Sequence, residues 1–173
     1  VCFNAALDVA TGDYVWCQSD DDFVADDYAE KMVSLFQDNP DCTTAAGLPV
    51  SIDIDGHLLN TGPRKTNYRP RYMPGHLLAL DSVRGGNTMF GAPGTIFTVK
   101  RDELIEGGGF AQPIEYVHLY GIVPFGVTGF DRTAMSYWRH HDGQLNKEST
   151  ARGSIGATEL FSLLKKHSIE RRW

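Results

Sequence analysis

Three consecutive aspartates, Asp20, Asp21 and Asp22, follow a short apolar segment and constrain this chain more than any other feature. The segment 14–17 contains the β-branched and aromatic residues that are typical of a buried strand. Three neighbouring carboxylates cannot all stay ionised at the end of a strand unless a cation compensates their charge. Mg²⁺ and Mn²⁺ prefer such oxygen ligands and often share them with phosphates. Because ligands bind at strand ends in open α/β sheets, the segment predicts a metal-dependent site for a phosphorylated substrate.

The overall composition is that of an ordinary globular domain. At 173 residues the chain is long enough to bury a sizeable core, and one domain is expected. The formal charge of −6 argues against non-specific binding to nucleic acid. Three cysteines without paired spacing indicate neither a disulfide framework nor a zinc site, which favours a reducing cytoplasm. No apolar run approaches the roughly 20 residues that span a bilayer.

The hydrophobic pattern alternates between helical and strand spacing and so predicts the α/β class. Large apolar side chains recur at helical spacing between residues 25 and 38. The segment 53–57 carries the Asp-Gly signal of a tight hairpin turn. Helices are expected over residues 4–10, 25–38, 76–84, 114–123 and 158–173, and strands over residues 14–18, 43–54, 95–99 and 134–138.

Several blocks of the sequence resemble, in the same order, those of family 2 glycosyltransferases, which are inverting enzymes of the GT-A fold. The blocks correspond to the family's nucleotide-sugar core, its hairpin after the fourth strand, its acceptor-side strand with a glycine turn, and its closing segment. In this chain they are residues 4–15, 19–23, 52–56, 95–101, 108–110 and 137–144. The resemblance implies a GT-A-like, Rossmann-like mixed sheet flanked by helices.

The resemblance extends over residues 4–147 and divides the chain in two. It implies a glycosyltransferase-like domain over residues 1–150 and a helical tail over residues 151–173. Such domains begin with a strand, a helix and a strand that form the base pocket, and this chain is expected to lack about 40–50 residues there. A second departure is Ser19, which stands where the family's commonest acidic pattern has an aspartate.

The resemblance implies a role for each residue of the aspartate cluster. Asp20 would hold the ribose, Asp21 would bind a Mn²⁺ or Mg²⁺ ion, and Asp22 would orient the loop or contact the substrate through water. From the residues alone, an alternative is that the three aspartates cap the helix expected over residues 25–38. A single aspartate is enough for capping, which favours the metal site.

Two residues near the end of the resemblance complete the implied donor site, and a third supplies the base. Arg139 would face the diphosphate and His141 the metal; alternatively, Arg139 pairs with a carboxylate and His141 is a half-buried hydrogen-bonding residue. Glu115 stands before an aromatic residue, as the family's general base does. It would deprotonate the acceptor hydroxyl on the opposite face of the sugar from the diphosphate. Its alternative is a solvated glutamate at the N-terminus of a helix.

These residues support three hypotheses of function. The leading one is a metal-dependent, inverting transferase that uses a nucleotide-diphospho-sugar donor and a saccharide or lipid-linked acceptor, as in polysaccharide biosynthesis. The second is a non-catalytic nucleotide- or carbohydrate-binding remnant of such a domain. The third, a phosphatase with an aspartate nucleophile, is disfavoured because Phe23-Val24 follows the aspartates, where such enzymes have Gly-Thr or Gly-Val.

Partners and location follow from the same patterns. A sheet that lacks its leading strands exposes an edge, so homo-oligomers are expected. Arg64, Lys65, Arg69 and Arg71 either hold a phosphate of the donor or lipid-linked acceptor, or face solvent in a loop over residues 61–75. The basic helix expected over residues 158–173 either lies on a membrane surface or packs on the domain. The expected location is the cytoplasm, with peripheral attachment to the membrane as the alternative.

Overall fold

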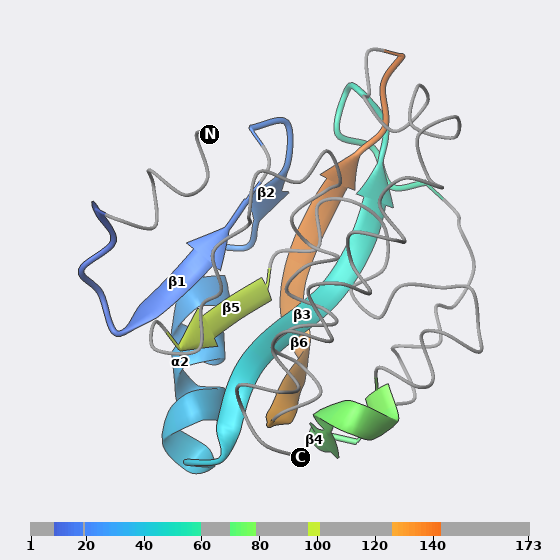
Figure 1. Cartoon of the computed structure of the whole chain (residues 1–173). Helices are drawn as coiled ribbons and strands as arrows, with labels where there is room; N and C mark the ends of the chain where they lie inside the picture. The colour runs from blue at the N-terminus through green and yellow to red at the C-terminus, as the bar shows by residue number, and fades with distance from the viewer. Residues whose placement is uncertain (1–8, 19, 60–69, 79–96, 101–125, 143–173) are drawn as a thin grey trace, which may run out of the picture.

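The computed structural model describes five segments of the chain, and they form one mixed sheet with a helix packed against it (Figure 1). The described segments are residues 9–18, 20–59, 70–78, 97–100 and 126–142. The elements are β1 (Tyr14–Cys17), β2 (Phe23–Val24), α2 (Tyr28–Asp38), β3 (Cys42–Ile52), β4 (Tyr72–Pro74), β5 (Phe97–Lys100) and β6 (Val127–Arg139). The predicted α/β class with a mixed sheet is confirmed.

The strand order brings three chain segments to one edge of the sheet. The six strands are ordered β1-β5-β3-β6-β2, and β4 pairs with β6. β5 is antiparallel to both β1 and β3, so β1 and β3 run in the same direction. β3 is parallel to β6, as their arrowheads show in Figure 1. The carboxyl ends of β1, β3 and β6 therefore lie at the same edge, which is where ligands bind in open α/β sheets.

Helix α2 begins three residues later than its apolar spacing predicts. The backbone N–H of Ala25 donates to the carbonyl oxygen of Met135, at 3.0 Å, so residue 25 extends the pairing of β2 with β6 and cannot join the helix. Asp27 occupies the N-cap position without a side-chain capping bond. Asp20 to Asp22 are separated from the helix by β2. The alternative that the three aspartates cap this helix is therefore wrong.

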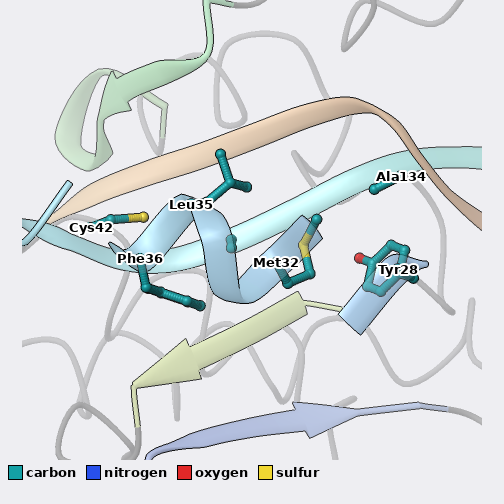
Figure 2. Packing of buried hydrophobic residues seen from close by; sticks show 7 residues of the cluster. Tyr28, Met32, Leu35, Phe36, Cys42 and Ala134 are labelled. Carbon is teal, nitrogen blue, oxygen red and sulfur yellow. The ribbon is translucent and has the colours of Figure 1, made fainter. Parts of the chain in front are cut away.

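The apolar face of α2 forms the core against the centre of the sheet (Figure 2). Tyr28, Met32 and Leu35 are almost completely buried against small side chains of β3 and β6. Small residues on the strands let the helix approach closely: a Cβ on Gly129 would lie 3.1 Å from the Leu35 side chain. Each large apolar side chain buried in this way contributes about 2 kcal/mol. This packing fixes the positions of β3 and β6 and hence of their carboxyl ends.

Several boundaries differ from the expectations. β6 begins at Val127, well before the expected start at residue 134, and β2 was not expected at all. Part of the expected basic loop over 61–75 forms β4, and residues 75–78 form a helical turn where a helix was expected. Arg71 pairs with Asp38 at 2.6 Å on the surface, which fits the solvated alternative for this residue.

Other expectations lie outside the described residues. They are the helices over 4–10, 114–123 and 158–173, the residues Glu115, Arg64, Lys65 and Arg69, and the domain boundary at residue 150. Within the described segments, no helix has the length and apolarity needed to cross a membrane.

Candidate functional site

Three loops meet at the carboxyl edge of the sheet, and each follows one of the strands that end there. The aspartate cluster follows β1, the turn of residues 53–57 follows β3, and residues 139–141 end β6. The backbone N–H of His140 donates to the carbonyl oxygen of Ile52 at 2.9 Å, which joins the turn to the end of β6. The turn and this end of β6 lie side by side in Figure 1. Chain segments far apart in sequence thus form one polar site.

Asp22 is the buried member of the aspartate cluster. Its side chain is only 6% exposed, and its Oδ1 atom accepts a hydrogen bond from the backbone N–H of Arg139 at 2.9 Å. Its own carbonyl oxygen accepts a hydrogen bond from Nε2 of Gln18 at 2.6 Å. Burial raises the pKa of the Asp22 carboxyl to about 6, and the neighbouring Asp21 adds to the rise, while the Arg139 N–H bond opposes it. Asp22 therefore anchors the loop to β6.

Asp21 and His141 face one another across the site. The Oδ2 atom of Asp21 lies 2.8 Å from Nε2 of His141, and both side chains are partly exposed. A carboxylate oxygen and an imidazole nitrogen at this separation are a pair that a divalent cation can take as ligands. The structure brings together the two residues that the sequence resemblance implied as metal ligands.

Arg139 contacts neighbouring segments through several of its nitrogen atoms. Besides its backbone N–H, its Nε donates to the carbonyl oxygen of Asp21 at 3.2 Å, and its Nη1 donates to that of Ile54 at 2.6 Å. Its guanidinium also lies over the ring of Phe23, with Cζ 5.6 Å from the ring centroid. The expectation was an arginine that faces the substrate or pairs with a carboxylate. These contacts place its guanidinium against two backbone carbonyls and an aromatic ring.

A second group of possible metal ligands lies in the turn after β3. Asp53, Asp55 and His57 offer ligand atoms that all lie within 4.8 Å of one another. Asp53 already accepts hydrogen bonds from the backbone N–H groups of Asp55 and His57, which shape the turn, and Gly56 adopts a φ of +92° there. The sequence analysis predicted the turn but missed this group. The three residues stand at every second position, 53, 55 and 57, and this pattern could have revealed the group.

The comparison with known families decides what kind of protein carries this site. The sequence model of the family described as Glycosyl transferase family 2 matches residues 2–102, which is more than half of the chain. The chain belongs to glycosyltransferase family 2. No curated protein matches it.

Family membership gives the site its general chemistry. A family 2 glycosyltransferase implies a nucleotide-sugar donor and an acceptor, and its GT-A-like fold agrees with the mixed sheet described above. The match includes the aspartate cluster and the turn after β3, and it ends before β6.

The predicted residues of this family 2 glycosyltransferase fall into three groups. Asp21, Asp22, Arg139 and His141 come together at the carboxyl edge. Asp20 is exposed beside them, open to solvent. Glu115 lies outside the described residues. Gln18, which holds the Asp22 carbonyl, was missed, because nothing in its sequence context distinguishes it from a surface glutamine.

Proposed function

We propose that this protein transfers a sugar from a nucleotide-diphospho-sugar to an acceptor hydroxyl, with inversion and with the help of a divalent cation. The observation that carries the proposal is the meeting of Asp21 with His141 at the carboxyl edge of the sheet, at 2.8 Å. The family supplies the reaction class, and we assign the donor diphosphate to this site as part of the proposal.

The residues at this edge fit a divalent cation. Asp21 and His141 together offer one carboxylate oxygen and one imidazole nitrogen, and both are partly exposed, so an ion can reach them. Carboxylate ligands suit Mg²⁺ and Mn²⁺ alike, whereas the imidazole nitrogen favours Mn²⁺. The chemistry that such an ion supplies when bound is neutralisation of the negative charge on the departing diphosphate.

The other residues of the cluster orient the donor and the loop. Asp20 is exposed and offers a carboxylate to the ribose hydroxyls. Asp22 is buried and holds the loop against β6 through the Arg139 N–H. Both roles place the donor so that its diphosphate lies beside Asp21.

The transfer itself requires a base on the opposite face of the sugar. The acceptor oxygen forms a bond to the anomeric carbon, while the bond from that carbon to the diphosphate oxygen breaks and its electron pair leaves with the diphosphate. The acceptor proton passes to a carboxylate, for which we propose Glu115. Attack from the face opposite the leaving group inverts the anomeric centre. Replacing Glu115 with Gln should abolish most turnover but leave donor binding intact.

Calorimetric titration tests the donor site directly. UDP, GDP and their sugar conjugates are titrated against the protein with and without Mn²⁺. We expect one nucleotide to bind, and to bind more tightly when Mn²⁺ is present. If the nucleotide binds equally well with and without Mn²⁺, the protein is the alternative, a nucleotide- or carbohydrate-binding remnant without metal chemistry. If no nucleotide binds, there is no donor site at this edge of the sheet.

A further inference from the structure

Arg139 stands where the three loops of the site meet. Its backbone N–H is bonded to the buried Asp22 carboxylate, which fixes the main chain at the end of β6. From that fixed point its side chain reaches two other segments. The residue therefore contacts the loop after β1 and the turn after β3 while belonging to β6 itself.

Side-chain hydrogen bonds of Arg139 reach backbone carbonyls in two different loops. Nε donates to the carbonyl oxygen of Asp21, at 3.2 Å, and Nη1 donates to that of Ile54, at 2.6 Å. Because the guanidinium is planar and rigid, its nitrogen atoms hold both acceptors at a fixed mutual distance. A lysine keeps the charge but has a single nitrogen on a flexible stem, and cannot reproduce this spacing.

An aromatic pair supports the guanidinium on one side. Phe23 lies directly opposite Tyr137 in the pairing of β2 with β6, and their rings stack with centroids 4.5 Å apart and planes inclined by 17°. The Arg139 Cζ lies 5.6 Å from the Phe23 centroid, within the range of a cation–π contact. Phe23 is 39% exposed, so its ring is held between the Tyr137 ring, the guanidinium and solvent.

We propose that Arg139 is a positioning residue that latches the turn of residues 53–57 to the aspartate loop, and that Phe23 holds its guanidinium in place. The latch fixes the backbone of Asp21, and hence the direction of the carboxylate that faces His141. Its effect on metal binding rests on the proposed function; the coupling of the two loops does not. Arg139 acts on the donor site through Asp21.

Hydrogen–deuterium exchange on the protein without metal or nucleotide tests the latch. Arg139→Lys should speed exchange by roughly tenfold in two segments together, residues 20–24 and residues 53–59, because both lose a charge-assisted hydrogen bond. Phe23→Leu should give a smaller rise in the same two segments, and Phe23→Tyr, which keeps the ring, should behave like the wild type. In a parallel titration followed by electron paramagnetic resonance, Arg139→Lys should weaken Mn²⁺ binding.

A matched control exists at the other end of β6. Arg71 likewise lies over an aromatic ring, Tyr72, with Cζ 5.8 Å from its centroid, but it pairs with Asp38 and is remote from the site. Arg71→Lys should change neither exchange in the two segments nor Mn²⁺ binding.

Three results overturn the proposal. In Arg139→Lys they are a rise in exchange in only one of the two segments, no rise in either, or an equal rise in α2, which marks general destabilisation. If the wild type does not bind Mn²⁺, the proposed metal site is wrong. The exchange experiment then still tests the latch by itself.

Discussion

The Oδ2 atom of Asp21 lies 2.8 Å from the Nε2 atom of His141, although the two residues are 120 positions apart in the sequence. The pairing exists because β1, β3 and β6 all end at the same edge of the sheet. Neither residue is fully buried, so the pair remains reachable by an ion from solvent. The proposed metal dependence of this glycosyltransferase rests on this pair.

Loss of either Asp21 or His141 should weaken the binding of Mn²⁺ in the absence of nucleotide. We expect Asp21→Asn and His141→Gln each to lower the affinity by at least about tenfold, since each removes one proposed ligand. The double variant should be little worse than the weaker-binding single variant, because both changes disable one site. Electron paramagnetic resonance of free Mn²⁺ during titration measures the affinities.

The turn after β3 provides the control for that experiment. His57→Gln and Asp53→Asn remove possible ligands from the other metal-binding group without touching Asp21 or His141. If these variants lose Mn²⁺ affinity and the Asp21 variant keeps it, the cation site lies in the turn and the present assignment is wrong.

Burial of Asp22 should make the stability of the metal-free protein depend on pH. Because its pKa in the folded protein, about 6, is higher than the ordinary 3.8, the fold favours the protonated carboxyl. Its contribution to stability is complete below pH 4 and is lost as the pH rises through 6. The loss amounts to about 3 kcal/mol. Denaturant unfolding in the presence of a chelator, at several pH values, measures it.

The variant Asp22→Asn isolates this effect, because an amide can still accept the Arg139 N–H bond but carries no charge. Its stability relative to the wild type should rise between pH 4 and pH 7. If the difference in unfolding free energy between Asp22→Asn and the wild type stays constant over this range, burial does not favour the protonated form of Asp22.

Gly47 should not tolerate any side chain. A Cβ at this position would lie 2.2 Å from the carbonyl oxygen of Ala134 and 2.5 Å from the Tyr28 ring, at the point where β3 and β6 approach the helix. We expect Gly47→Ala to destabilise the fold by at least about 2 kcal/mol or to prevent folding. Gly12→Ala is the control, because its Cβ would make only an ordinary contact with the Tyr14 carbonyl at 3.4 Å. Equal melting temperatures for the two variants would contradict the close approach.

The sequence predicted those parts of the fold whose local pattern and tertiary role agree. The strand expected over residues 14–18 was found from its β-branched and aromatic residues, and most of the helix that ends at residue 38 was found from its apolar spacing. The first half of β6 was missed because Gly129 and Asp131 are of types depleted in strands. In the fold, Gly129 is small because the Leu35 side chain packs directly on it, which is a tertiary requirement that no local pattern carries.

The sequence predicted which residues form the candidate site but not which contacts each of them makes. The resemblance pointed to Asp21 and His141, and the structure brings them together. It also pointed to Arg139 as a substrate contact, which stays a prediction; in the structure the nitrogen atoms of Arg139 donate to Asp22, Asp21 and Ile54. The bonding of Arg139 depends on the register of β3 with β6, and a single sequence does not reveal that register.

The most direct test is the Mn²⁺-dependent binding of a nucleotide sugar to Asp21→Asn, measured by calorimetry beside the wild type and Asp53→Asn. We expect the wild type and Asp53→Asn to bind the donor more tightly when Mn²⁺ is added. Asp21→Asn should lose this gain. An undiminished response to Mn²⁺ in Asp21→Asn would contradict the claim that Asp21 and His141 form the donor-diphosphate site.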